Sequence, residues 1–246
     1  QPDLLLIYAG HNEFVGPYGA TTPFVYFGEN RTLIRTLMNL QSTRLYGVLR
    51  DIVRRFGPEP PQGRFGLHLV TREVDILDDA HRITGENYQR NLETIIQAAT
   101  DRGVSVILST LVSNLKDFHP LRATCPELDQ TRPTNLTTTD ERTIKNLLAQ
   151  SPYCAALHFA LGRHYYRQGL SAQAQQAFIR ARDMDRLPFR APTNFNRILR
   201  QLADDQDQVV LSDSEAAFAA ASPQGIIGSE LITDSDEDGA EKENGQ

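Results

Sequence analysis

The fold class follows from residues 84–108, which read TGENYQRNLETIIQAATDRGVSVIL. Apolar residues recur there at helical spacing, which predicts a helix over about residues 84–102. The predicted inner stripe of this helix consists of Tyr88, Leu92, Ile95, Ile96 and Ala99. Gly103 is a natural end for the helix, and the β-branched run at 104–108 predicts a buried strand. A helix, a glycine and a strand in this order are typical of a parallel α/β sheet.

Two further segments fit the same sheet. Residues 3–8 form an apolar run ended by Gly10, which predicts another buried strand. Late in the chain a helical stripe precedes a predicted strand at 209–211, and it consists of Phe195, Ile198, Leu199 and Leu202. Ser212 is then predicted to cap a helix, with Glu215 at capping-box spacing. We therefore expect a parallel, flavodoxin-like sheet flanked by helices, to which an amphipathic helix at 32–56 adds an arginine-rich, solvated face.

Composition excludes several classes of protein. The 246 residues are 40% hydrophobic and 23% charged, which is ordinary for a folded protein. The net charge is −6, but residues 233–246 hold six acidic residues and one lysine. The rest of the chain is close to neutral, which argues against nucleic-acid binding. No apolar run approaches the length of about 18 residues needed to span a bilayer, and no signal peptide is evident.

Further expectations follow from the two cysteines and from the first residue. Cys125 and Cys154 are too few for a disulfide scaffold and do not resemble a zinc-binding set, so we expect no metal and no cofactor. The chain starts at Gln1, directly before the first predicted strand. This start indicates a fragment of a longer protein or a processed chain.

A helix–turn–helix segment interrupts the α/β pattern at 155–186. It reads His158-x-x-Leu161-Gly162-x-x-Tyr165, followed by Ala174-x-x-x-Phe178 and Ala181. This resembles the tetratricopeptide pattern W-x-x-L-G-x-x-Y with A-x-x-x-F, except that His158 replaces Trp. The alternative is an unrelated helical hairpin with a similar core. Because one repeat cannot bury its own face, a predicted helix at about 138–150 is expected beside it.

These patterns predict four parts of the chain. They are an α/β part at 1–137, a helical insertion at 138–186, a return to the α/β part at 187–232 and an acidic, disordered tail at 233–246.

Chemistry is expected in loops that follow the predicted strands, because ligands bind beyond the carboxyl ends of parallel strands. The loops are residues 10–14, residues 110–120 with Asn114, Asp117 and His119, and residues 212–214. In the first, Gly10 permits a sharp exit from the strand. Asn12 then offers two uncharged N–H donors, which suit the oxyanion of an acyl-transfer intermediate. The alternative is that Asn12 caps a turn and His11 is a solvated loop residue.

The first strand and Gly10-His11-Asn12-Glu13 resemble the third sequence block of the SGNH (GDSL-type) hydrolases. That block is a buried strand followed by G-x-N-D, and here Glu13 stands in the Asp position. The order of segments is also similar to members of the family that carry tetratricopeptide repeats, and residues 187–191 and Asp213-x-Glu215-x-x-Phe218 support this. The resemblance implies a serine ester hydrolase or acyltransferase that acts on a small-molecule or glycan ester.

The resemblance also implies roles for residues of this chain. Asn12 would be the oxyanion donor and Gly10 would position it. His11, Glu13 and Asn114 would contact substrate. Relatives of this kind are often exported and anchored to a membrane by an upstream segment.

The chain departs from the family at both ends of the expected active-site set. No G-D-S block is present, so the nucleophilic serine is missing. The family's last block is D-x-x-H, in which His is the general base. Asp234 matches its Asp, but Glu237 stands where His is expected, and Asp117-Phe118-His119 is one residue too short. Ser109, Ser113 and Ser212 have no base adjacent in sequence. We therefore expect a fragment, truncated at both ends, that is inactive by itself.

The alternative function is a protein-interaction module. In that case the helical repeat would recruit a protein partner and the α/β part would be a non-catalytic scaffold. Recovery of a partner that is unchanged after removal of residues 138–186 would argue against the module. A fragment with no independent function is the third alternative.

Overall fold

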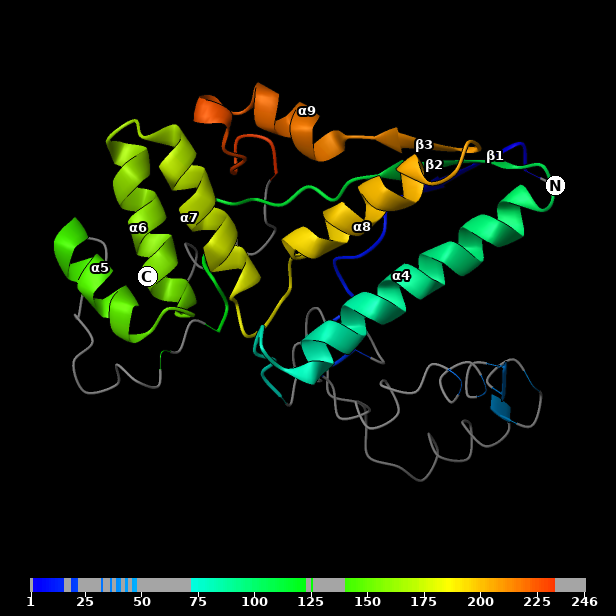
Figure 1. Ribbon diagram of the computed structural model, residues 1–246, viewed down its shortest axis with the longest axis horizontal. Coiled ribbons are helices and arrows are strands. Elements are labelled where there is room, and N and C mark those ends of the chain that lie inside the picture. Colours follow the sequence, from blue (N-terminus) through cyan, green and yellow to red (C-terminus); the bar gives the residue numbers. More distant parts are fainter. Residues whose placement is uncertain are drawn as a thin grey trace, which may run out of the picture.

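The computed structural model describes residues 2–15, 19–21, 72–122 and 140–232, together with residues 32, 36, 39, 40, 43, 46, 47 and 125. The predicted disordered tail and most of the predicted helix at 32–56 lie outside these residues. The described part is an α/β structure with one parallel sheet in the order β1-β2-β3 (Figure 1). The strands are β1 (Leu4–Ile7), β2 (Ser105–Ser109) and β3 (Val209–Ser212). The helices are α4 (Asp79–Thr100), α5 (Glu141–Gln150), α6 (Ala155–Arg167), α7 (Ser171–Asp183), α8 (Thr193–Asp204), α9 (Ser214–Ala221) and the short 3₁₀ helix η3 (Pro223–Gly225).

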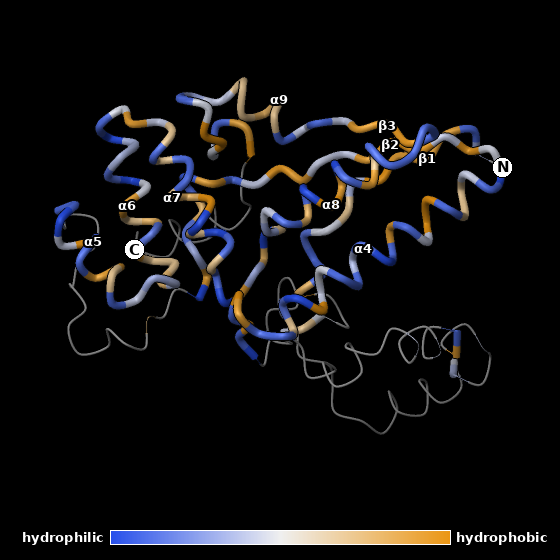
Figure 2. Tube along the Cα trace, in the orientation of Figure 1, coloured by the Kyte–Doolittle hydropathy of each residue, from blue (hydrophilic) through white to orange (hydrophobic). Residues whose placement is uncertain are grey.

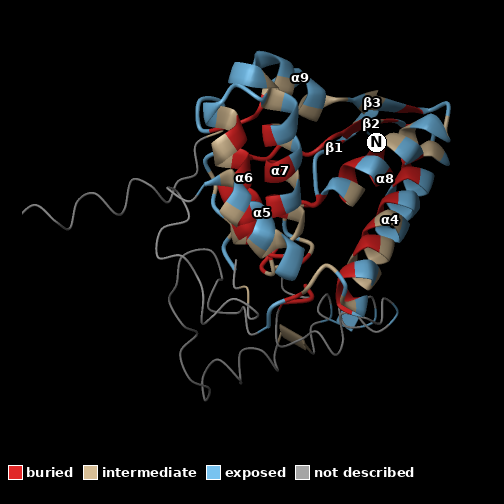
Figure 3. Cartoon of the chain, turned by 60° about the vertical axis from the view of Figure 1, so that its left-hand side comes forward, coloured by how far each residue is buried: buried red, intermediate tan, exposed pale blue. Residues whose placement is uncertain are grey.

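One face of the sheet packs against α4 and α8, which lie on the same side of it (Figure 1). The register brings Ile7 beside Leu108 and Val106 beside Val209, and all four side chains are buried in this core. The four residues of the stripe predicted for α8 are buried, which confirms that stripe. Figure 3 shows buried residues along the side of α4 that faces α8.

The stripe predicted for α4 is correct except at one position. Tyr88, Leu92, Ile96 and Ala99 are buried, but Ile95 is 46% exposed. The buried positions repeat every three or four residues, and Ile95 lies beside that line on the border with solvent. Gly103 has a φ of 70°, as the predicted helix end requires.

The first strand, predicted to be buried, is buried on one face only. Leu4 and Leu6 are 51% and 62% exposed, and Val210 of β3 is 59% exposed. Figure 2 shows that the strands are nonetheless hydrophobic along much of their length. The reason is that α4 and α8 cover one face of the sheet, and in the described part of the chain β1 pairs only with β2. Parallel sheets are ordinarily covered on both faces, whereas the second face of this sheet exposes apolar side chains. Within the described ranges β1 also has no neighbour on its outer edge.

A second core lies among α5, α6 and α7, with Leu115 and Ile226 contributed by loops of the α/β part. The five residues that match the repeat pattern, from Leu161 to Phe178, are buried, and so is Ala181. A Cβ on Gly162 would lie 2.7 Å from Cδ1 of Phe178, so glycine is what lets the Phe178 ring approach α6. The Tyr165 hydroxyl donates to Oε1 of Glu141 at 3.1 Å and so joins α6 to α5. The helix predicted at 138–150 begins at Glu141, because Asp140 caps it by accepting from the Thr143 N–H.

Two local features differ from the sequence prediction. The cap of α9 is Asp213, which accepts from the Ala216 N–H, and not Ser212, which is the last residue of β3. Cys125 and Cys154 form a disulfide, with their Cα atoms 5.3 Å apart. It ties the segment that follows β2 to the residue before α6, a link to which the sequence analysis gave no weight. None of the described helices combines the length and apolar character that crossing a membrane requires.

Candidate functional site

The loop after β1 leaves the strand through a position that only glycine fits. Gly10 has a φ of 148°, a region that other residues rarely adopt. A Cβ at this position would also lie 2.5 Å from Cδ1 of Leu111 and 3.1 Å from the Tyr88 hydroxyl. The Tyr88 hydroxyl itself donates to the Ala9 carbonyl at 2.8 Å. The backbone just before His11 is therefore held against α4 and the loop after β2.

His11 is anchored between loops. Its Nδ1 accepts a hydrogen bond from the Ala191 N–H at 3.2 Å, which places the proton of the neutral ring on Nε2. Burial lowers the pKa of His11, and the nearby Arg182 and Arg190 guanidinium groups lower it further, although a hydrogen bond with the Val112 backbone acts in the opposite sense. The imidazole is therefore held neutral and fixes the β1 loop to the segment between α7 and α8.

Asn12 is the exposed residue at the tip of this arrangement. Its side chain makes no hydrogen bond to any described residue, so its two amide N–H donors are available to a ligand. Glu13 beside it is half-buried, and burial raises the pKa of its carboxyl group. The loop therefore presents an unengaged amide next to a fixed, neutral imidazole.

Asn114, predicted to contact substrate, has a structural role in the loop after β2. It is buried, and its Oδ1 accepts from the Asp117 N–H at 3.0 Å, which closes a turn. The Arg190 side chain donates to the Asn114 carbonyl at 2.8 Å and to the Phe118 carbonyl at 3.1 Å. These bonds hold the loop in place, whereas the predicted role would need the Asn114 side chain at an open surface.

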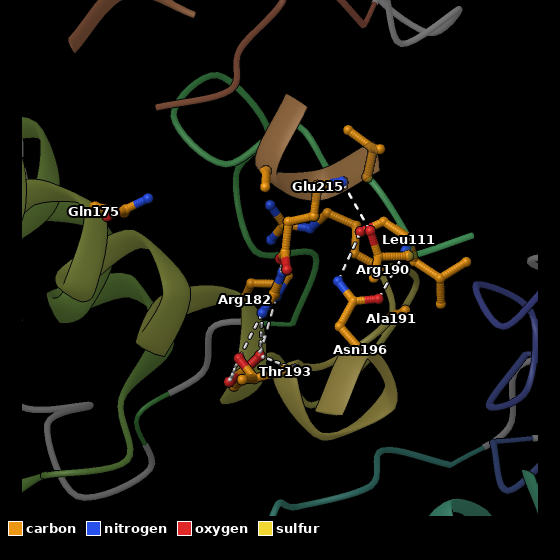
Figure 4. A network of polar contacts seen from close by, with 12 residues as sticks. Leu111, Gln175, Arg182, Arg190, Ala191, Thr193, Asn196 and Glu215 are labelled. Atoms are coloured by element: carbon orange, nitrogen blue, oxygen red, sulfur yellow. Dashed lines mark hydrogen bonds and ion pairs between the residues drawn. The ribbon is translucent and has the colours of Figure 1, made fainter. Parts of the chain in front are cut away.

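Asn196 of α8 holds the loop after β2 in place, a role that the sequence did not predict. Its Oδ1 accepts from the Leu111 N–H at 2.7 Å and its Nδ2 donates to the Leu111 carbonyl at 2.9 Å (Figure 4). Because this buried amide pairs with both the backbone N–H and the carbonyl of Leu111, it fixes the path of the chain beyond β2. An asparagine inside a helical pattern gives no sequence signal for such a long-range pair.

Arg182 of α7 was also missed. It is 3% exposed, and it donates to Thr193 Oγ1 at 2.7 Å and contacts the Asp183 carboxylate at 3.0 Å (Figure 4). Its Nη1 also lies 4.0 Å from Oε1 of Glu215 on α9. Arg182 thus joins the helical part to the α/β part and adds positive charge behind the His11 loop.

Hydrogen bonds tie the loop after β3 to the end of β2. Thr110 Oγ1 donates to Asp213 Oδ1 at 3.0 Å and accepts from the Glu215 N–H at 2.8 Å. Ser109 and Ser214 share a hydrogen bond of 2.8 Å between their hydroxyls. The strand-end serine Ser109 therefore has a structural partner, and no histidine of the described ranges is bonded to it.

The structure brings Gly10, His11, Asn12 and Glu13 together in one loop. Asp234, the last predicted site residue, lies outside the described residues. Over the ranges that the structure describes, no group of three or more His, Cys, Asp and Glu residues is arranged to hold a metal ion. Comparisons with known protein families, with curated proteins and with solved structures found no match to this chain. A proposal for the function therefore rests on the geometry of the site alone.

The buried imidazoles predict a pH dependence of stability. Burial lowers the pKa of His11, His81 and His158 below 6.5, whereas the unfolded chain keeps the ordinary value. The unfolded state therefore binds more protons, and the free energy of unfolding is expected to fall as the pH drops from about 7.5 to about 5.5. Urea titrations across this range measure the slope.

The variant His11→Gln separates this contribution from those of other groups. Gln keeps an acceptor for the Ala191 N–H but does not titrate, so its slope should be shallower than that of the wild type. Glu13 and Asp185, whose pKa values burial raises, act in the opposite direction in both chains and cancel in the comparison. Equal slopes for the two chains would contradict the assignment to His11.

Proposed function

We propose that this chain carries the oxyanion-binding part of an SGNH-like ester hydrolase or acyltransferase, built on a flavodoxin-like sheet with a tetratricopeptide-type hairpin. The observation that carries the proposal is the Asn12 amide, exposed and unengaged in the loop that follows a parallel strand. Gly10 and His11 hold the backbone on its N-terminal side. The fit of Phe178 against Gly162 supports the repeat-type hairpin.

Asn12 is suited to stabilise charge that develops in acyl transfer. When a nucleophile attacks an ester carbonyl, negative charge builds on the carbonyl oxygen, and an amide N–H can donate to it without carrying a charge of its own. One such donor contributes about 3–4 kcal/mol to transition-state stabilisation in known serine hydrolases. The buried cations Arg182 and Arg190 behind the neutral His11 favour an anion in the same region.

The nucleophile must come from outside the described loops. Ser109 is bonded to Ser214, and Ser113 is buried with no hydrogen-bond partner for its hydroxyl among the described residues. Neither serine is bonded to a base that the structure describes. The open edge of β1 is where a further parallel strand would bring its carboxyl end close to Asn12. We therefore propose that a strand carrying the nucleophilic serine pairs with β1.

An NMR titration with methylphosphonate tests Asn12 as an anion donor. The tetrahedral anion imitates the intermediate, so the side-chain amide signal of Asn12 should shift as the probe is added. The amide of Asn196, which is buried and bonded to Leu111, is the internal control and should not move. Asn12→Asp keeps the size of the side chain but removes both donors, so it should abolish the remaining response of the loop. A response that persists in Asn12→Asp would overturn the role.

The rate of ester hydrolysis is a second test of the role proposed for Asn12. The chain alone should hydrolyse a short acyl ester no faster than the buffer, because neither Ser109 nor Ser113 is bonded to a base in the described part of the chain. Robust turnover that Asn12→Ala leaves unchanged would show that ester chemistry occurs without the proposed oxyanion donor, and would refute the assignment.

A further inference from the structure

A pocket of about 420 Å³ lies between the α6–α7 hairpin and the loops of the α/β part. Sites for small organic ligands measure about 300–1,000 Å³, so its size suits such a ligand. It shares no residue with the Asn12 loop, and what it binds is therefore independent of the ester chemistry proposed there. The residues that line it are Lys116, Asp117 and His119 after β2, Arg163, Tyr166 and Arg167 of α6, Phe178 of α7 and Ser229 after η3.

The carboxylates on the loop side of the pocket already have partners. The Lys116 ammonium group contacts Glu230 Oε2 at 2.6 Å and lies 3.9 Å from Asp117 Oδ2. Asp117 Oδ2 also accepts from the N–H and the hydroxyl of Ser229, both at 2.9 Å. Because Asp117 and Glu230 are engaged in this way, the loop side does not suit a cationic ligand.

The hairpin side of the pocket presents one guanidinium group that the described chain does not use. Arg163 is partly buried, and its side chain has no hydrogen bond or ion pair with any residue that the structure describes. Burying a cation without a counter-ion is costly, so its place in the pocket wall indicates that an anion binds there. The helix dipole does not explain this cation, because Arg163 precedes the last turn of α6. We assign no ligand contact to Arg167, whose Nε donates to the Arg163 carbonyl at 3.2 Å.

Tyr166 adds a second group that can contact the same anion. It lies three residues after Arg163 on α6, and residues at this spacing are neighbours on one side of a helix. Its hydroxyl has no hydrogen-bond partner in the described part of the chain, so the O–H is available as a donor. The Tyr166 ring lies 5.5 Å from the Lys116 ammonium group and, with Phe178, gives the pocket an aromatic surface.

We propose that this pocket binds a small aromatic carboxylate. The planar guanidinium group of Arg163 pairs with both carboxylate oxygens, and the Tyr166 hydroxyl donates to one of them. The ring of the ligand packs against Tyr166 and Phe178, since aromatic rings favour offset or edge-on contacts with one another. A carboxylate fits this arrangement better than a simple inorganic anion, because an inorganic anion would leave the aromatic surface without a contact.

An NMR titration of the full chain with benzoate tests the proposal. The backbone amide signal of Ser229, which lines the pocket, should shift in a saturable way as benzoate is added. Benzamide has the same ring and shape but no charge, so it should bind at least about tenfold more weakly. Added salt should lower the affinity for benzoate. The side-chain amide signal of Asn12 serves as the second reporter, because it distinguishes this pocket from the loop after β1.

Substitutions show which groups hold the carboxylate. Arg163→Gln should weaken benzoate binding at least about tenfold and bring it close to that of benzamide. Tyr166→Phe keeps the ring but removes the hydroxyl, so it should weaken benzoate by about three- to tenfold. The matched change Arg142→Gln, at an exposed position of α5, should leave the affinity unchanged. Far-ultraviolet circular dichroism and thermal melts verify that each variant is folded.

Several results would overturn the proposal. They are no shift of Ser229 at about 10 mM benzoate, equal affinities for benzoate and benzamide, and an affinity for benzoate that Arg163→Gln leaves unchanged. A saturable shift of Asn12 without one of Ser229 would also overturn it, because benzoate would then bind at the loop after β1. Tighter binding of inorganic phosphate than of benzoate, reported by Ser229, would assign the pocket to an inorganic anion instead.

Discussion

Phe178→Ala is expected to lower the free energy of unfolding by about 3–5 kcal/mol. The ring is 1% exposed, packs edge-on against Phe159 with centroids 5.3 Å apart and lies over Gly162 of the neighbouring helix. Its loss leaves a cavity between α6 and α7, whose packing against each other forms most of the second core. Urea unfolding followed by circular dichroism measures the change. A loss below about 1 kcal/mol would show that the hairpin does not depend on this contact.

A second substitution shows whether Gly162 and Phe178 form one packing unit. In the wild-type chain Gly162→Ala should be destabilising, because its Cβ would meet the Phe178 ring at 2.7 Å and overpacking costs about 1–3 kcal/mol. In the Phe178→Ala chain the same change should become stabilising by up to about 1 kcal/mol, since alanine favours a helix over glycine by that amount. A double-mutant cycle detects this change of sign in the effect of Gly162→Ala as a coupling energy between the two residues. Gly169→Ala is not a suitable control, because Gly169 has a φ of 72°. Gly85→Ala in α4 is a control for the coupling alone: its Cβ would lie 3.0 Å from Asn194 Nδ2, so its effect should be the same with or without the Phe178 ring.

The sequence predicted the helices and strands because their local patterns are strong. The apolar stripes of α4 and α8, the β-branched run of β2 and the small residues of the hairpin each follow from residues close together in the chain. The boundaries moved by a few residues, as at α9, where Asp213 rather than Ser212 accepts from the backbone of the first turn. Which of two adjacent polar residues caps the helix can be predicted only when the last residue of the strand is known.

The environment of β1 could not be predicted from its own residues. An apolar run is compatible with burial on one face or on both, and the choice depends on which elements cover the sheet. Here α4 and α8 lie on one side, so Leu5 and Ile7 face the core while Leu4 and Leu6 remain exposed. The exposed face and the open edge became visible only in the structure, and they now carry the proposal that a further strand pairs with β1.

In the candidate site too, some residues could be predicted from the sequence and others could not. The Gly10-His11-Asn12 loop was found because its residue types suit a strand end and an oxyanion. The residues that hold the loops in place were not predicted, because they are far away in the sequence. Ala191, Arg190 and Asn196 lie between 76 and 180 positions along the chain from the groups that they contact. Long-range hydrogen bonds have no periodicity, so a single sequence gives no signal for them.

The Cys125–Cys154 disulfide is expected to contribute about 3–4 kcal/mol to the free energy of unfolding. The two cysteines are 29 residues apart, and the cross-link removes the entropy that an open loop of this length gives the unfolded chain. The double change Cys125→Ala with Cys154→Ala should therefore lower the midpoint of urea unfolding under non-reducing conditions. Dithiothreitol should produce a similar loss in the wild-type chain and none in the double variant.

The location of this bond makes the loss specific to one part of the molecule. Cys154 immediately precedes α6 and is buried in the second core with Ile144 and Leu157, whereas the sheet has a separate core with α4 and α8. Hydrogen exchange should therefore speed up first in α5 and α6 of the double variant, while the amides of β2 remain protected. Equal acceleration in β2 would show that the two cores unfold as one unit. Unchanged exchange throughout, with no response of the wild type to dithiothreitol, would contradict a stabilising disulfide.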